Sequence, residues 1–351
     1  MKIKEQTKQL IILIAVFAVV LGVYCALRSG NEKKALQEQE KEDFVALEEK
    51  LLELEDLIEL SFTDRDGMIL TFARNDGVWL CTNEPDLPLS QTAMEDIEYY
   101  LRGLGCQRAI KEPDALSDYG LDPAVCTVCA VDVNGNSTTV LLGNEVDHED
   151  MYYALGENPN VVYTVEGSLM NSVNKRLLEL AQVDEVPELT EASVKSVSVT
   201  TGEQSITLNK TTEKKQTTQM QETGELDAGG QAVTEEIEVV VEVYTWKLSG
   251  GKKISGKNEA LLTILDELSN LSFDAVCDFR PTEEELEAYE LNQVLAVELM
   301  DGTLFELHIG CKDRESATRC YARVEGSELI HTMSSSGVDA LLSLTKDALT
   351  A

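Results

Sequence analysis

Hydrophobic and polar residues alternate along most of the chain after residue 57, in short runs that Asp-Gly and Asn-Gly dipeptides interrupt. Such alternation is typical of β-strands that bury one face. The dipeptides supply the positive φ angles that tight hairpin turns require. They occur at Asp66-Gly67, Asp76-Gly77, Asn134-Gly135 and Asp301-Gly302. The pattern therefore predicts antiparallel sheet.

Two segments have helical spacing instead. Apolar residues recur every three or four positions at Met94, Ile97, Leu101 and Leu104, and again at Leu261, Ile264, Leu268 and Leu271. This spacing places each set on one face of a helix. Each predicted helix follows a strand-like run that contains a tryptophan, Trp79 in one case and Trp246 in the other.

These segments belong to an internal duplication. Trp246 lies 167 residues after Trp79, and the same spacing relates Gly310 to Gly143. Tyr119 in "DYGLDPA" matches Tyr289 in "AYELNQ". A fixed spacing of this kind indicates a repeated structural unit. Each copy is predicted to be α+β: a strand, a turn, a strand with tryptophan, a helix, a Tyr-x-Leu corner, a hairpin, another strand pair and a final helix.

We place the first repeat at 57–183 and the second at 190–351. They differ mainly by an insertion at 209–243, where the first copy has only a short turn. Its Thr, Gln and Glu content predicts a long hairpin or loop, with a strand near its end. For the repeated tryptophans, a core position in each copy and an exposed platform for glycan or peptide are the two interpretations.

The segment Leu10–Leu27 has 18 residues and no charge, and as a helix it would span roughly 27 Å, close to a bilayer core. No small-x-small cleavage motif follows it. We therefore predict a cytoplasmic tail and uncleaved transmembrane anchor at 1–30, and a juxtamembrane helix at 31–56. Lysines and arginines flank both sides, so their distribution does not fix the orientation. A short tail before one large domain is typical of an anchor whose C-terminal domain is extracytoplasmic.

The acidic balance narrows the choice of partners. The chain has 29 basic and 64 acidic residues, a formal net charge of −35. Nucleic-acid binding depends on the neutralisation of phosphates by Lys and Arg, so this charge argues against it. The same argument applies to the surface of anionic lipids.

Candidate reactive residues are few. Cys126 and Cys129 have the spacing of a redox motif, but on a strand they point to opposite faces. Cys311 and Cys320 bracket a polar loop between two predicted strands and are a candidate disulfide. We expect no bound metal, although Asp147, His148, Glu149 and Asp150 form an acidic loop. His308 and His331 have no histidine at metal-ligand spacing. We identify no catalytic or cofactor-binding motif.

Several motifs resemble one family. The anchor, "DGVW", "YGLDPA", "TTVLLGN" and "YY…VVYTV" are similar to the domain-of-unknown-function family numbered 4340. The resemblance is strong over 57–183 and looser over 190–351. It implies a bacterial membrane-anchored protein encoded beside ABC-type transporters that resemble those named for gliding motility. It implies no catalytic activity and carries no functional residues to this chain.

The sequence thus favours a membrane-anchored, non-catalytic extracytoplasmic protein, an accessory that contacts the permease subunits of an ABC-type transport system. The alternative is an extracytoplasmic module that binds a solute or glycan between the two repeats. An uncharacterised envelope enzyme is a third interpretation.

Overall fold

The computed structural model describes residues 51–52, 54–146, 149–202, 204–226 and 232–350. The predicted anchor Leu10–Leu27, most of the juxtamembrane helix and His148 lie outside these residues. The described residues between 51 and 56 are not helical, so the helix predicted for 31–56 does not extend to its end. Within the described residues, no helix is both long and apolar enough to cross a membrane.

The chain divides into two compact units after Arg176. The first unit contains, in chain order, β1 (Leu57–Thr63), β2 (Ile69–Asn75), β3 (Val78–Cys81), α2 (Gln91–Arg102), β4 (Cys106–Lys111), η1 (Leu116–Tyr119), β5 (Cys126–Asp132), β6 (Ser137–Val146), β7 (Met151–Leu155), β8 (Val161–Glu166) and α3 (Ser168–Val173). The strands form one antiparallel sheet in the order β3-β2-β1-β5-β6-β7-β8-β4.

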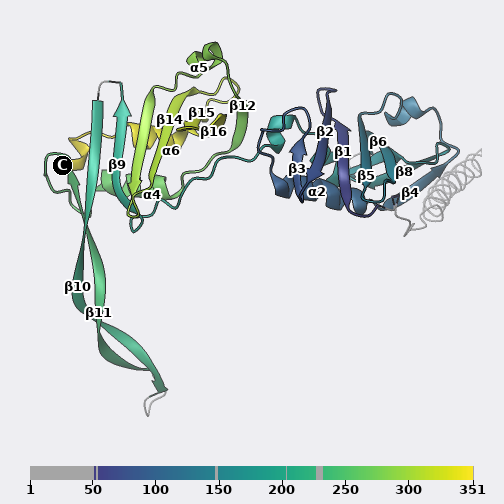
Figure 1. The fold of residues 1–351 in the computed structure, drawn as a ribbon. Coiled ribbons are helices and arrows are strands. Elements are labelled where there is room, and N and C mark those ends of the chain that lie inside the picture. The colour runs from purple at the N-terminus through teal and green to yellow at the C-terminus, as the bar shows by residue number, and fades with distance from the viewer. Residues whose placement is uncertain (1–50, 53, 147–148, 203, 227–231, 351) are drawn as a thin grey trace, which may run out of the picture. The chain divides into compact units, whose positions relative to one another are not determined.

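The second unit contains η2 (Leu177–Leu180), β9 (Val194–Thr201), β10 (Gln204–Leu226), β11 (Ala232–Leu248), α4 (Glu259–Ser269), β12 (Ala275–Phe279), α5 (Glu283–Tyr289), β13 (Gln293–Leu299), β14 (Leu304–Lys312), β15 (Arg319–Val324), β16 (Leu329–Ser334), α6 (Ser335–Leu342) and η3 (Ala348–Thr350). Its sheet has the order β11-β10-β9-β13-β14-β15-β16-β12 (Figure 1). The two orders are the same strand for strand, as a duplication requires.

Both units are mostly β: each has one eight-stranded antiparallel sheet, with two α-helices in the first unit and three in the second among the described residues. The additional strands are β4 and β12, which follow the first long helix of each copy and pair with the last strand, β8 or β16. Each is therefore the edge strand on one side of its sheet. Their sequences, "CQRAIK" and "AVCDF", are too short and irregular to show a clear alternation.

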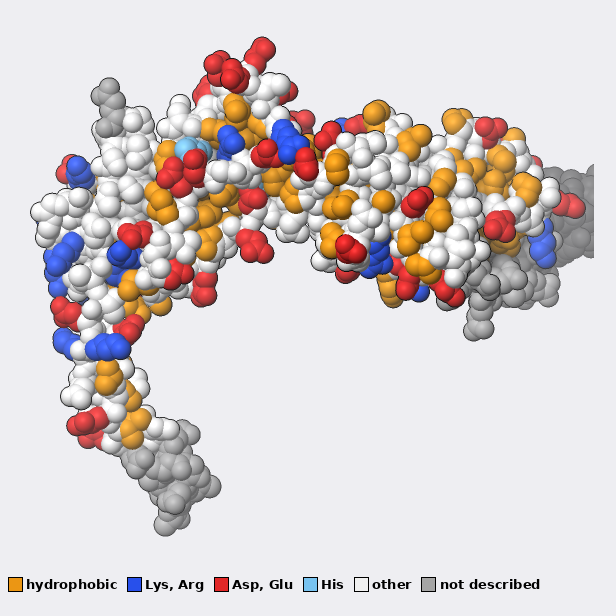
Figure 2. Space-filling view, viewed as in Figure 1, with side chains coloured by type: hydrophobic (Ala, Val, Ile, Leu, Met, Phe, Trp, Pro, Cys, Tyr) orange, Lys and Arg blue, Asp and Glu red, His pale blue; other side chains and the backbone are white. Residues whose placement is uncertain are grey.

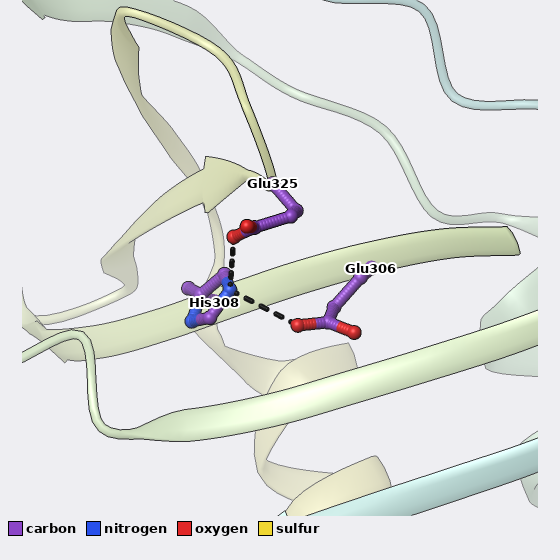
Figure 3. A group of neighbouring side chains, drawn as sticks. All are labelled: Glu306, His308 and Glu325. Atoms are coloured by element: carbon purple, nitrogen blue, oxygen red, sulfur yellow. Dashed lines mark hydrogen bonds and ion pairs between the residues drawn. The ribbon is translucent and has the colours of Figure 1, made fainter.

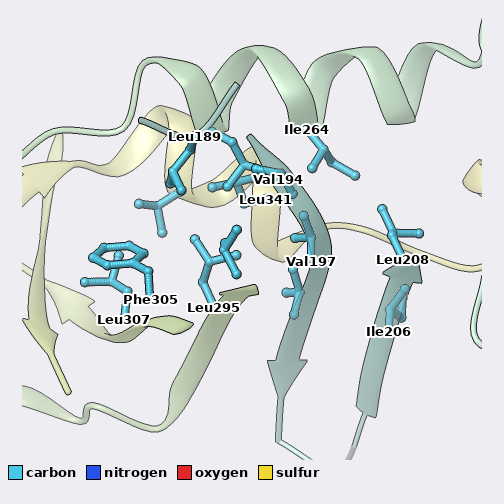
Figure 4. Packing of buried hydrophobic residues seen from close by; sticks show 14 of the residues in the cluster. Leu189, Val194, Val197, Ile206, Leu208, Ile264, Leu295, Phe305, Leu307 and Leu341 are labelled. Atoms are coloured by element: carbon cyan, nitrogen blue, oxygen red, sulfur yellow. The ribbon is translucent and has the colours of Figure 1, made fainter. Parts of the chain in front are cut away.

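The long helices begin where side chains cap them. Ser90 accepts a hydrogen bond from the backbone of Ala93 at the start of α2, and Asn258 accepts one from Leu261 at the start of α4. Such caps satisfy backbone N–H groups that have no partner inside the helix. In the second unit, Ile264 of α4 and Leu341 of α6 meet Leu295 of the sheet in a continuous apolar core (Figure 4).

The repeated tryptophans lie in these cores. Trp79 is fully buried and Trp246 is 2% exposed, which excludes an exposed aromatic platform. Trp79 pairs with Arg74 on the neighbouring strand, and Trp246 pairs with Lys210. The two side chains therefore hold equivalent positions next to a basic residue.

The insertion at 209–243 is a hairpin rather than a loop. Strand β10 pairs with β9 only as far as Asn209, whereas its pairing with β11 continues from Lys210 to Leu226. Residues Lys210–Leu226 and Ala232–Trp246 thus form a two-stranded ribbon that leaves the sheet (Figure 1). All side chains of 211–221 on β10 are exposed.

Candidate functional site

Two potential metal ligands lie on the outer face of β14. Along this strand Phe305, Leu307 and Ile309 are buried in the core, and the alternate residues Glu306 and His308 face outward. Residues two apart on a strand share a face, so the imidazole and the carboxylate lie side by side. Strand β14 is held between β13 and β15, which fixes the backbone at both positions.

A third side chain completes the group. Glu325 directly follows β15, and its Oε2 lies 2.8 Å from His308 Nε2, while Oε1 of Glu306 lies 3.3 Å from the same nitrogen (Figure 3). The three ligand atoms lie within 4.8 Å of one another. With both carboxylates ionised, His308 donates to them from Nε2. The group offers one nitrogen and two oxygens to a ligand.

His308 and Glu325 also line a depression of about 370 Å³ on the surface of the second unit. Its other wall is formed by the end of α5 and the residues that follow: Leu286, Glu287, Glu290, Leu291 and Asn292. Arg323 contributes the one positive charge of the lining and donates from Nε to the Ser327 carbonyl. The lining is therefore acidic, and Figure 2 shows the histidine surface next to acidic side chains.

Helix α5, which forms one wall of the depression, is stabilised by hydrogen bonds at its own N-terminus. Thr282 accepts a hydrogen bond from the backbone of Glu285, and the Glu285 carboxylate accepts one from the backbone of Thr282. This reciprocal pair starts the helix. The hydrogen bonds that the Glu285 carboxylate accepts from the backbone N–H and the hydroxyl of Thr282 lower the pKa of Glu285. The helix ends at Tyr289, and the next residue, Glu290, has a left-handed φ of 52°. Glu290 lines the depression.

The first repeat does not carry the same group. At the spacing of 167 residues, Thr139 and Leu141 stand where the second repeat has Glu306 and His308. Leu141 packs against an apolar cluster around Leu121, Leu155 and Val162. The fold therefore forms with an apolar residue at the histidine position, and nothing in the repeat's architecture requires Glu306, His308 and Glu325.

The seven cysteines among the described residues are free thiols. Cys126 is buried, and Cys129 lies on the opposite, half-buried face of β5, as the alternation predicts. Burial raises the pKa of Cys126 to about 11, so this thiol stays protonated at neutral pH. Cys126 therefore does not supply the activated thiolate that a redox motif uses.

The candidate disulfide between Cys311 and Cys320 is not formed. Cys320 is 3% exposed and points into the core, where its sulfur approaches the Met333 carbonyl. Cys311 is half-buried and its sulfur approaches the Ala288 carbonyl. The partner of Cys320 across the strands is Lys312 rather than Cys311. The two sulfurs thus contact different carbonyls and are not bonded to each other.

The remaining repeat-equivalent residues pack at the corners. Tyr119 stacks edge-on against Tyr153 with ring centroids 4.9 Å apart, and Tyr289 packs in the same way against Tyr321 at 4.7 Å. In the second copy, the Tyr289 hydroxyl also donates to Asp278 at 2.6 Å. Burial and this carboxylate raise the pKa of Tyr289. These tyrosines have a structural role.

His331 is not part of the lining of the depression and is fully buried on β16. Its Nε2 accepts a hydrogen bond from the backbone N–H of Asp184 at 3.2 Å, and its ring stacks on Phe273. Burial lowers the pKa of His331, although the Asp184 carboxylate acts in the other direction. The neutral imidazole joins β16 to the segment that precedes β9.

The sequence contains part of the signal for the Glu306, His308 and Glu325 group. The run "FELHI" alternates apolar and polar residues, which predicts that Glu306 and His308 share the outer face. A search for histidine pairs overlooks this group because it has a single histidine. Glu325 follows the next strand, and its approach depends on the pairing of His308 with Arg323, which the sequence does not give.

Fold and site together define a protein of two tandem antiparallel-sheet units, the second of which carries a ribbon and an acidic depression. The family model described as "Domain of unknown function (DUF4340)" matches residues 79–242. The match begins at Trp79 on β3 and ends on β11, within a shorter range than the resemblance seen in the sequence. Neither a curated protein nor a solved structure matches the chain.

Proposed function

We propose that this chain is a non-catalytic accessory protein that is anchored in a membrane and contacts a multi-span permease of an ABC-type transport system on the extracytoplasmic side. The uncharged segment Leu10–Leu27 and the family resemblance support this proposal. The observation that carries it is the ribbon. Anchoring both partners in one membrane raises their effective concentration, so that a modest contact surface suffices.

One face of the ribbon has an apolar row on β11 formed by Ile237, Val239, Val241 and Val243, which we call the valine stripe. Its members are half-buried, or just exposed at 36% for Val243. Their partners on β10 are polar and exposed, for example Lys215 opposite Val241. Figure 2 shows hydrophobic side chains at the surface of the ribbon.

An isolated two-stranded ribbon is marginally stable in water. A partner that covers the valine stripe would bury apolar side chains and add hydrogen bonds to the free edge of a strand, as in other strand-mediated recognition. The opposite face of β11 carries Glu236, Glu238 and Glu242, all exposed. The ribbon therefore offers one apolar face and one acidic face, and the apolar face fits the protein partner.

Two neighbouring valines provide a matched pair of variants. Val241→Lys places a charge in the valine stripe, whereas Val240→Lys places it on the opposite face, where Val240 is already 61% exposed. After crosslinking in intact membranes, we expect the full-length chain and Val240→Lys to recover the permease, and Val241→Lys to recover at least fivefold less. Equal recovery by both variants, or recovery of no multi-span subunit, would contradict the proposal.

The alternative function is the binding of a solute or glycan, and the acidic depression beside α5 is the observation that favours it. A full-length chain that recovers no permease but binds a soluble sugar or peptide would replace the accessory function by this one. Any anchorless version used for comparison should begin before Leu51. Leu51 donates its backbone N–H to Leu104, and Leu52 is 5% exposed, so both belong to the first unit.

A further inference from the structure

We infer that Glu306, His308 and Glu325 bind one divalent transition-metal ion, and that zinc fits this donor set best. This inference is independent of the contact between the ribbon and a permease. It rests on the spacing of the donor atoms, their support by the sheet and the charge of the depression around them.

The spacing is close to that of a tetrahedral site. With metal–ligand bonds of about 2.0–2.1 Å, the donor atoms of tetrahedral zinc lie roughly 3.3 Å apart. His308 Nε2 lies 3.3 Å from Glu306 and 2.8 Å from Glu325. The Glu325 side chain is 67% exposed and directly follows its strand, so it can make the small adjustment that remains. A bound cation would replace the hydrogen bonds that now join the imidazole to the carboxylates.

The sheet prepares two of the three ligands. The side chains of Glu306 and His308 are 31% and 26% exposed, so neighbouring atoms already restrict both. Ligands on a central strand lose less conformational freedom on binding than ligands on a loop. The first repeat has Thr139 and Leu141 at these positions and keeps the same strand order, so the group is not a requirement of the fold.

The surroundings favour a cation. Glu287, Glu290 and Glu325 give the depression three acidic side chains against the single positive charge of Arg323. The imidazole discriminates among cations, because Ca²⁺ and Mg²⁺ prefer sites made of oxygen alone, whereas nitrogen suits zinc and its neighbours. Three protein donors leave a coordination position for water, as in zinc sites that remain open to a further ligand.

Cobalt(II) is a suitable probe because it adopts zinc geometry and absorbs visible light. The full-length chain in detergent, first stripped with a chelator, would be titrated with Co²⁺ in millimolar Ca²⁺ and Mg²⁺. Ca²⁺ and Mg²⁺ occupy the weak sites that surface carboxylates form on a chain with a net charge of −35, so that these sites do not bind Co²⁺. We expect one equivalent of Co²⁺ to give a visible absorption band, and Zn²⁺ to abolish it by displacement.

Four variants locate the site. We expect His308→Gln and Glu306→Gln each to weaken Co²⁺ binding at least tenfold. Glu298→Gln, which removes an outward carboxylate of the neighbouring strand β13 that is paired with Lys195, should bind normally. His148→Gln, in the acidic loop of the first repeat, should also bind normally. Thermal unfolding without metal would show that each variant is folded.

Three results would overturn the inference. One is the absence of a band at one equivalent. A second is full binding by both His308→Gln and Glu306→Gln. The third is a loss of the band in His148→Gln, which would assign the cobalt site to the first repeat.

Discussion

Gly143 and Gly310 are equivalent residues at which the backbone of each repeat passes very close to its own corner. A Cβ atom at Gly310 would lie 2.1 Å from the carbonyl oxygen of Tyr289, and one at Gly143 would lie 2.1 Å from that of Tyr119. The obstacle is backbone, which cannot rotate away as a side chain can. The shared spacing identifies these glycines in the sequence, but the reason for them appears only when the corner is in place.

We expect Gly310→Ala and Gly143→Ala each to lower the free energy of unfolding of their unit by about 2–3 kcal/mol, because the strand must move away from the corner. Gly256→Ala is the control. A Cβ there meets nothing within 4 Å, and its stability should be unchanged or slightly higher. Chemical denaturation measures the three values. An unchanged midpoint in Gly310→Ala would show that the corner yields easily.

The pH dependence of the second unit should depend on His331. Burial lowers the pKa of His331 in the folded chain, whereas the unfolded value is about 6.5. The unfolded state therefore takes up the proton first. The contribution of the neutral His331 side chain to the free energy of unfolding is complete above about pH 6.5. It declines as the pH falls toward the folded pKa, by up to about 1.4 kcal/mol per pH unit.

Denaturation between pH 7 and pH 5 measures this slope. We expect His331→Gln to flatten this slope. Carboxylates whose pKa is lowered, such as Asp132 and Asp301, lose their contribution only below about pH 4, outside this interval. A slope that survives in His331→Gln would place the titrating group elsewhere.

At the scale of elements, the sequence predicts most strongly what repeats. Helix α2 and helix α4 bury most of each predicted face, including Ile97 and Ile264, whereas Leu104 and Leu271 lie just beyond the helix ends. The sequence does not distinguish a hairpin from a loop at the ribbon. From Thr211 to Gln221, strand β10 has no buried face and therefore no alternation of apolar and polar residues. Cross-strand pairing alone defines such a strand, and pairing is a property of two segments together. Strands β4 and β12 were missed for a similar reason.

The first repeat shows how the ribbon can be removed. Arg74 and Asn75 pair with Trp79 and Val78 around the Asp76-Gly77 turn, as Lys210 and Thr211 pair with Trp246 and Thr245. Replacement of residues 212–244 by Asp-Gly should therefore give a tight hairpin. We expect the thermal midpoint of unfolding to stay within about 3 °C of the full-length chain, since the excised side chains contribute little to the core. A large fall would mean that the ribbon supports the sheet.

At the scale of the whole molecule, duplication and charge are the properties that sequence alone could establish. The identical strand orders confirm the two repeats, and the family match, from residue 79 to residue 242, includes parts of both. The acidic depression lies in the second repeat. To predict this depression, one would have to know that the chain turns at Glu290. The sequence does not indicate that turn, because glutamate is not a residue type that favours the left-handed region.

The length of the ribbon sets how far this protein can reach. At about 3.3 Å per residue, the stretch of β10 from Lys210 to Leu226 extends roughly 50 Å beyond the last pairing with the sheet, more than the thickness of a bilayer's hydrocarbon core, about 30 Å. A partner that binds near the far end of the ribbon would not need to contact the sheet of the second unit. The first repeat, with its two-residue turn, has no such arm, so the duplication produced one copy that stays compact and one that extends outward.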